Sequence, residues 1–217
     1  YRLIFIPETI GSINYISKNY KNLKTNLKAG FVLTCLGNEK HFSIVKNIKT
    51  NFAERTVVKV LNNNSLSYKI YPWLDRGSDE RQFCSPNVDL PVVCISRSKF
   101  HQFKEYHTSL DNLNFITAKG LIDSFKMLKK CICEIDNNIF YTNTYQCEPF
   151  LTKYNLMSTI NKFDKKKHLE RTKILNILSY CNGENNLDDI SKYTKLSKEY
   201  VKKNLKILLN KKIIKRD

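Results

Sequence analysis

The sequence lacks any apolar run close to the 18 residues that a membrane-spanning helix needs. Its longest apolar stretches, around Leu90–Ile95 and Phe31–Leu36, have the length of β-strands. The opening residues Tyr1–Ile6 lack a basic segment, a long apolar stretch and a small-residue cleavage site, which argues against a signal peptide. We therefore expect a cytoplasmic protein.

The sequence also lacks a Cys-x-x-Cys pair, although it has seven cysteines. Cys131 and Cys133 are separated by a single residue, and no second pair lies at zinc-ribbon spacing. Cys35 and Cys94 fall inside apolar strand-like runs, where a reduced cysteine behaves as a small hydrophobic residue. We expect reduced thiols and no cysteine-based structural zinc site.

Acidic residues are scarce, with 20 Asp and Glu against 37 Lys and Arg and a net charge of +17. The segment 162–217 alone holds 16 basic and seven acidic residues. Such an excess allows two interpretations: a surface that meets an anionic partner, or a lysine-rich surface that is simply solvated. The hydrophobic content of 41% is sufficient for a buried core and argues against wholesale disorder.

Strand-like and helix-like segments alternate over the first two thirds of the chain, which predicts an α/β fold with a mainly parallel sheet. The apolar positions from Ile10 to Leu27 recur at spacings of three and four, as in a helix. A buried strand at the very start suggests that the chain is a fragment with sequence missing upstream. The predicted strands are Arg2–Ile6, Gly30–Gly37, Thr56–Leu61 and Leu90–Ser96, and the predicted helices are Ile10–Leu27 and Ala118–Glu134.

Helical periodicity returns after the charged joint Lys165–Lys167. Three short helices, the third capped by Ser197, and a strand from Ile213 predict a winged helix-turn-helix. We place an α/β domain over residues 1–150 and the winged helix over residues 162–217.

Three short segments concentrate polar residues that can bind metals. They are Phe5-Ile6-Pro7-Glu8-Thr9-Ile10-Gly11-Ser12, Leu74-Asp75-Arg76-Gly77-Ser78-Asp79-Glu80-Arg81-Gln82-Phe83 and Glu105-Tyr106-His107-Thr108-Ser109-Leu110-Asp111-Asn112. Taken singly, Glu8 could cap a helix, Asp79 could join a surface ion-pair cluster, and a lone His107 is more often structural than a ligand.

In this order, the three segments resemble the co-catalytic zinc aminopeptidases and the related glutaminyl cyclases. The wording I-P-E-T-I-G-S, D-R-G-S-D-E-R-Q and E-Y-H-T-S-L-D is more closely similar to a bacterial aminopeptidase-like family that also carries a C-terminal winged helix. The resemblance covers essentially the whole chain. It implies a three-layer, zinc-peptidase-like mixed sheet, present here as its C-terminal part.

The resemblance also implies roles for four residues. Asp79 and His107 would be zinc ligands, and Glu8 would be a third ligand or the general base. Asp111 would orient His107 without binding the zinc itself. One or two zinc ions would serve a hydrolase acting on a peptide-like or aminoacyl substrate. The chain departs from the family pattern, because only Glu8 stands where relatives have two adjacent glutamates, and the family's first His and bridging Asp would lie upstream. We therefore expect the chain alone to be inactive.

The winged helix leaves a second class of function open. Four lysines fall on the exposed side of its third helix, where a DNA reader would place its contacts, but lysines supply phosphate affinity rather than base specificity. The alternatives to a hydrolase are thus a DNA-binding regulator with a ligand-sensing α/β part and a non-catalytic metal-binding protein. A winged helix can also be a packing or dimer module, which would make a homo-oligomer. The four lysines are Lys198, Lys202, Lys203 and Lys206.

Overall fold

The computed structural model describes residues 1–156 and 164–216, which form two compact units, Tyr1–Asp136 and Asn137–Asp217. From the sequence we had placed the division between residues 150 and 162. The first unit instead ends at Asp136, because the strand Tyr141–Asn143 pairs with a strand at the C-terminus and so belongs to the second unit.

A four-stranded mixed sheet forms the centre of the first unit, in the order β1-β4-β2-β3. β4 pairs parallel with β1 and antiparallel with β2, and β2 pairs parallel with β3. Every residue of β4 is buried, as expected for a central strand with packing on both faces. The strands are β1 (Gly30–Leu33), β2 (Phe42–Val45), β3 (Tyr68–Tyr71) and β4 (Val92–Arg97).

One face of this sheet packs against α2 (Phe52–Asn63) and α4 (Ala118–Asp136). The prediction of a strand at Thr56–Leu61 is wrong, because this segment lies within α2. Its β-branched residues favour a strand locally, but Asn51 caps a helix by accepting a hydrogen bond from the Glu54 backbone N–H. Helical spacing then buries the apolar residues of α2 against the sheet: Ala53, Val57, Val60 and Leu61.

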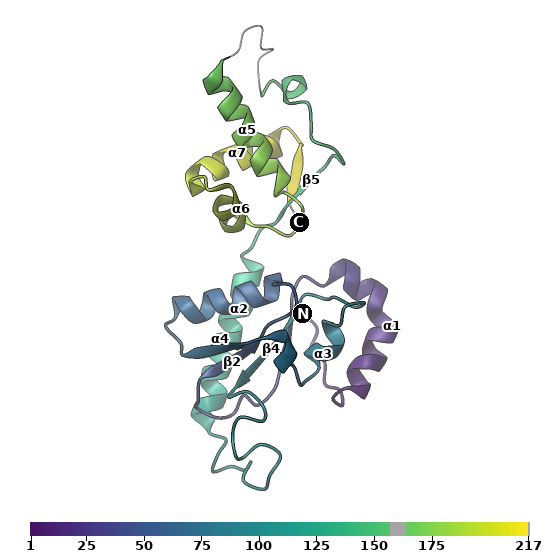
Figure 1. The fold of residues 1–217 in the computed structure, drawn as a ribbon, viewed down its shortest axis with the longest axis vertical. Coiled ribbons are helices and arrows are strands. Elements are labelled where there is room, and N and C mark those ends of the chain that lie inside the picture. Colours follow the sequence, from purple (N-terminus) through teal and green to yellow (C-terminus); the bar gives the residue numbers. More distant parts are fainter. Residues whose placement is uncertain (157–163, 217) are drawn as a thin grey trace. The chain divides into compact units, whose positions relative to one another are not determined.

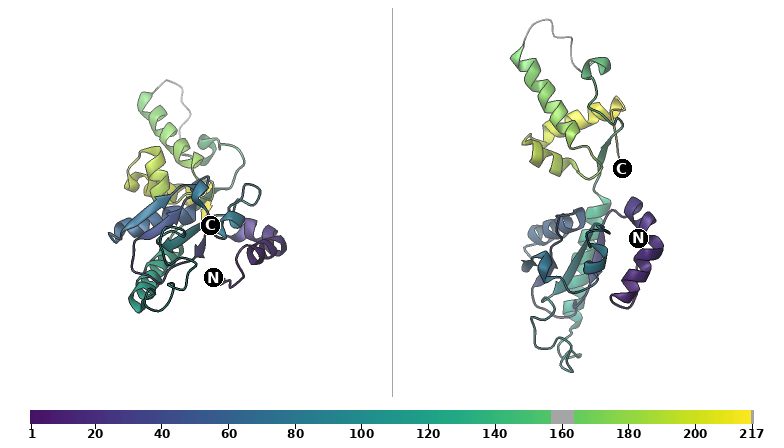
Figure 2. Two further views of the ribbon diagram at one scale, coloured as in Figure 1. Left: turned by 60° about the horizontal axis from the view of Figure 1, so that its bottom comes forward. Right: turned by 45° about the vertical axis from the view of Figure 1, so that its right-hand side comes forward.

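The opposite face carries α1 (Ile10–Asn26) and the short α3 (Glu80–Phe83). Ile16 and Leu23, one helical stripe of α1, pack with Phe83 and Val92. Figure 1 shows α1 and α3 on one side of the strands and α2 and α4 on the other, and the turned views of Figure 2 keep this layering. The three-layer α/β fold expected from the sequence is confirmed.

The first residues do not form the predicted buried strand. Arg2–Ile6 has no regular secondary structure, and Tyr1, Leu3 and Phe5 are 87%, 83% and 92% exposed. In the first unit, the strand pairings of the described residues join β1 to β4, and none of them includes Arg2–Ile6.

The second unit has the expected winged-helix arrangement of three helices and a two-stranded antiparallel sheet. Ser197 caps α7 as predicted, since its side chain accepts a hydrogen bond from the Tyr200 backbone N–H. α6 begins with a capping box between Asn186 and Asp189. The elements are β5 (Tyr141–Asn143), the 3-10 turn η2 (Leu151–Tyr154), α5 (Lys165–Ser179), α6 (Leu187–Thr194), α7 (Lys198–Asn210) and β6 (Ile214–Arg216).

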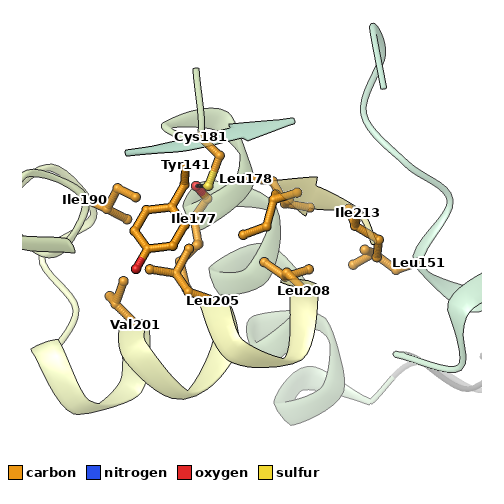
Figure 3. Close-up of a cluster of buried hydrophobic side chains, with 11 residues drawn as sticks. Tyr141, Leu151, Ile177, Leu178, Cys181, Ile190, Val201, Leu205, Leu208 and Ile213 are labelled. Atoms are coloured by element: carbon orange, nitrogen blue, oxygen red, sulfur yellow. Dashed lines mark hydrogen bonds between the residues drawn. The ribbon is translucent and has the colours of Figure 1, made fainter. Parts of the chain in front are cut away.

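An apolar cluster of the described residues holds this unit together. Figure 3 shows Leu205 and Leu208 of α7 pointing toward Ile177 and Leu178 of α5, with Tyr141 of β5 closing the cluster. All five side chains are buried. Among the helices of the described ranges, none combines the length and apolar character that a membrane crossing requires.

Replacing Leu205 tests whether this cluster stabilises the unit. Leu205→Ala removes a side chain that is 2% exposed. We expect the free energy of unfolding of the helical C-terminal unit to fall by about 2–5 kcal/mol, because the cavity adds to the lost burial. Urea unfolding followed by circular dichroism measures it. The neighbouring exposed Lys206→Ala is the control, and equal stabilities of the two variants would contradict this assignment.

Candidate active site

Three of the four predicted site residues line one cavity. Glu8, His107 and Asp111 face a space of about 400 Å³ in the first unit. The cavity lies beyond the carboxyl end of β1, where Thr34 to Asn38 form part of its wall. Strand ends of α/β sheets are where ligand sites collect, and here the topology brings together side chains that lie a hundred residues apart in the chain.

The fourth predicted residue, Asp79, has a different position. It is not among the residues that line the cavity, although its neighbour Ser78 is. Its Oδ1 accepts hydrogen bonds from the Thr9 backbone N–H and the Ser12 hydroxyl, both at 2.8 Å. Asp79 thus fixes the turn that directly follows Glu8. The expectation that Asp79 is itself a metal ligand stays a prediction.

The turn after Glu8 has an unusual backbone that explains why it needs these bonds. Thr9 precedes α1 with a φ of 64° and a ψ of −69°, a positive-φ conformation that non-glycine residues rarely adopt. Arg81 adds a third contact by donating from a terminal guanidinium nitrogen to the Thr9 hydroxyl at 2.9 Å. Glu8 does not cap α1 with its side chain, which instead faces the cavity.

Glu80 holds the backbone on the other side of the Asp79–Thr9 contact, and no pattern in the sequence pointed to this role. Its side chain is fully buried, and its Oε1 accepts hydrogen bonds from the backbone N–H groups of Gly77 and Ser78, at 2.7 and 3.1 Å. These bonds fix the backbone that presents Asp79 to Thr9. Glu80 follows Asp79 directly in a charged segment, so from the pattern alone it was one acid among several.

His107 is held by ring stacking. Its imidazole lies 4.0 Å from the Tyr106 ring, centroid to centroid, with only 14° between the planes. Its backbone is also left-handed, with a φ of 55°. No hydrogen bond joins His107 and Asp111 within the ranges that the structure describes, so the expected orienting role of Asp111 remains a prediction, whereas its place on the cavity wall is observed.

Six other residues that line the cavity have apolar side chains, and sequence reasoning missed them. Phe103 stacks on Phe115 at 5.5 Å, and the Lys40 ammonium lies 5.8 and 5.4 Å from these two rings. The high density of aromatic residues between positions 100 and 115 was visible in the sequence, but only folding directs them to one space. The apolar wall residues are Leu36, Phe100, Phe103, Phe115, Ile116 and Leu121.

Cys35 also lines the cavity but lacks the character of a nucleophile. Burial raises the pKa of the Cys35 thiol, and the charges of Asp111 and Glu8 raise this pKa further, against a contact with the Thr34 hydroxyl that lowers it. The thiol therefore stays protonated near neutral pH, and the thiolate is the reactive form. All seven cysteines are unpaired in the structure.

The donor types on the cavity wall are those that zinc prefers, namely imidazole and carboxylate. Their number is insufficient, however. Within residues 1–156 and 164–216, no three His, Cys, Asp or Glu side chains come close enough together to hold a metal ion. The described part of the chain does not by itself form a closed zinc site.

Comparison with known proteins places both units in families. Residues 1–138 match a family described as a domain of unknown function, DUF4910, and residues 139–216 match a winged helix-turn-helix family. The chain belongs to the DUF4910 family. The second match confirms the predicted C-terminal winged helix, and the names of two relatives agree with the predicted aminopeptidase-like family.

A Clostridium acetobutylicum protein named "Putative polysaccharide biosynthesis protein with aminopeptidase-like domain" is 39% identical over 197 residues, which are 88% of this chain and 44% of that protein. A crystal structure of a "putative peptidase" from Clostridium acetobutylicum is similar with a TM-score of 0.58 and 33% identity, over 97% of this chain and 47% of that one. The DUF4910 chain thus spans less than half the length of these relatives.

The Asp79 contacts can be tested by stability. Asp79→Ala leaves the Thr9 N–H and the Ser12 hydroxyl without their acceptor, and we expect a loss of about 1–2 kcal/mol in the free energy of unfolding. Asp79→Asn keeps one oxygen as acceptor and should lose less. Trp73, the single tryptophan, reports the unfolding of this unit by fluorescence. If both variants are as stable as the wild type, Asp79 does not fix the turn.

Proposed function

We propose that this chain is the part of an aminopeptidase-like hydrolase that binds a peptide-like or aminoacyl substrate and carries part of its catalytic centre. The observation that carries the proposal is the cavity itself. It is lined by Glu8, His107 and Asp111, which come from two segments that lie far apart in the sequence. The names of the relatives support the same class of reaction.

Glu8 and His107 have different roles in this proposal. Glu8, a carboxylate open to the cavity, is a metal ligand or the general base that takes the proton of the attacking water. His107 is a metal ligand held in place by Tyr106. When bound, zinc would lower the pKa of a coordinated water and polarise the scissile carbonyl.

The zinc part of the proposal requires donors beyond those described here. Three donors do not converge within the described ranges, so further ligands would have to come from a longer polypeptide of the length seen in the relatives. For the same reason, the proposal does not assign hydrolytic activity to this chain alone.

The apolar wall favours one kind of substrate. Phe103, Phe115 and Ile116 offer an apolar surface beside the polar groups of Glu8 and His107. Sites for small ligands typically combine such a surface with a few polar groups that fix orientation. An aminoacyl group with an apolar side chain matches this division.

A zinc competition titration tests the ligand assignment. We expect the wild-type chain to bind zinc weakly, because its donor set is incomplete, and His107→Ala to weaken binding by about tenfold or more, as loss of a ligand does. His168→Ala, which removes an imidazole of the other unit, is the matched control and should leave the affinity unchanged.

Two outcomes would count against the assignment. Equal zinc affinity of His107→Ala and the wild type would remove His107 as a ligand, and an equal loss in both histidine variants would show that binding is not specific to the cavity. Zinc binding through His107 without hydrolysis of aminoacyl substrates by the longer protein would favour the non-catalytic metal-binding alternative.

The second candidate function, binding of DNA, rests on the surface of α7. Lys202, Lys203 and Lys206 are exposed, while Asn204, the residue of α7 best suited to read bases, is buried and donates to the Tyr200 carbonyl at 2.9 Å. Asp188 forms an ion pair with Lys198 at 2.8 Å. This surface favours phosphate contacts without base reading.

The salt dependence of duplex binding tests this candidate. Replacing both Lys202 and Lys203 with Ala should reduce the slope of log K against log salt by about 2, because each phosphate contact contributes roughly 0.9. Lys126→Ala with Lys129→Ala, two exposed lysines of α4, is the control pair. Undetectable or salt-insensitive binding by the wild type would eliminate DNA as a partner.

A further inference from the structure

Residues 144–156, which follow β5, present aromatic rings at the surface of the second unit. Phe150 is 69% exposed and Tyr145 is 43% exposed. The Tyr154 hydroxyl donates a hydrogen bond to the Tyr145 hydroxyl at 2.5 Å, and the two rings lie 5.9 Å apart at 59°. Leu151, directly after Phe150, is buried in the apolar cluster of this unit, so the exposed ring stands on a fixed backbone. Exposed apolar surface of this kind often marks a binding site.

A basic part of the chain lies beside these rings. The Thr144 hydroxyl donates to the Lys212 backbone carbonyl at 2.8 Å, which joins the start of the aromatic segment to the turn between α7 and β6. Leu151 and Ile213 belong to the same buried cluster, and Figure 3 shows them at the same end of it. Their neighbours in the sequence, Phe150 and Lys212, are therefore brought to one region of the surface.

The charge of this region is predominantly positive. No Asp or Glu occurs from Tyr200 to Arg216, whereas this stretch holds seven Lys and Arg residues. Glu148 is the single acid of residues 144–156, and Lys153 offsets its charge. A surface of this sign attracts a polyanion. The basic residues that follow α7 are all exposed: Lys211, Lys212, Lys215 and Arg216.

The combination of rings and cations indicates which kind of polyanion fits. Lysine and arginine bind phosphate groups, and exposed aromatic rings stack on bases. The bases of a duplex are stacked on one another, whereas those of a single strand can turn outward onto a protein ring. Stacking accepts any base, because every base has an aromatic face, so such a surface needs no base-reading side chain.

We propose that residues 144–156 and the turn into β6 bind single-stranded nucleic acid, with bases stacked on Phe150 and Tyr145 and phosphates bound by Lys211 and Lys212. This site uses none of the α7 lysines that support duplex DNA as the second candidate function. It does not depend on the cavity of the first unit either.

Fluorescence anisotropy of the whole chain with labelled oligonucleotides of about 12 nucleotides tests this site. We expect oligothymidylate and oligouridylate to bind more tightly than a duplex of the same length. Phe150→Ala should reduce the affinity for both single strands by about fivefold or more, because one base loses its stacking partner. Phe150→Trp keeps a ring and should retain at least the wild-type affinity. Tyr193→Ala, which removes an exposed ring of α6, is the matched control and should change nothing.

A second pair of substitutions tests the phosphate contacts. Lys211→Gln with Lys212→Asn removes both charges, and Asn tolerates the positive φ of 56° at position 212. Each phosphate contact to a single strand contributes about 0.7 to the slope of log K against log salt, so this slope should fall by about 1.4. Replacing Lys202 and Lys203 of α7 with Ala should leave the single-strand slope unchanged.

Three results would overturn the proposal: no binding of either single strand, a duplex affinity equal to or above that of the single strands, or equal losses in Phe150→Ala and Tyr193→Ala. The comparison of oligothymidylate with oligouridylate shows whether DNA or RNA is the better source of the strand, and tighter binding of either one supports the site. Failure of this site leaves the zinc titration and its assignment of His107 unaffected.

Discussion

Asp79 joins two segments that lie 70 residues apart in the chain, and the geometry of the cavity depends on this connection. Its carboxylate accepts hydrogen bonds from Thr9 and Ser12, at the point where the chain turns into α1 and Thr9 has a positive φ. Such a backbone persists only where the surroundings stabilise it. Glu80, buried beneath, holds the backbone on the other side of the contact. Glu8 therefore has a defined place beside the end of β1, although Tyr1, Leu3 and Phe5 before it are exposed.

The other wall of the cavity has a different physical basis. Residues 98–117 contain no helix or strand among the assigned elements, yet they are ordered by aromatic contacts between Phe103, Tyr106, His107 and Phe115. Aromatic pairs at these distances stabilise a segment beyond their burial alone. The aromatic contacts that stabilise this segment thus also hold the His107 imidazole and form the apolar surface of the cavity. The stability of this wall and its proposed role therefore depend on the same side chains.

Secondary structure was predicted correctly from the sequence where apolar residues recur at helical spacing over a long segment. The prediction was poor where the pattern covers only a few residues. The helices from Ile10 and from Ala118 were found from their spacing, whereas Thr56–Leu61 has the β-branched residues of a strand but is helical, because the Asn51 cap and burial against the sheet outweigh local propensity. The order of the motifs predicted that Glu8, His107 and Asp111 would lie close together, and all three line one cavity. The contact of Asp79 with Thr9 and the aromatic wall require three-dimensional information that spacing does not contain.

The central claim is that Glu8 and His107 serve one binding space at the end of β1. Titration of the isotope-labelled chain with zinc, followed through backbone amide and imidazole NMR signals, tests it most directly. The account predicts shifts concentrated on residues 8–12, 34–38, 77–79 and 100–111, with His107 changing more than His41 or His168. Chemical-shift changes that fall mainly on the second unit would contradict it. A response to zinc at only one of Glu8 and His107 would also contradict it.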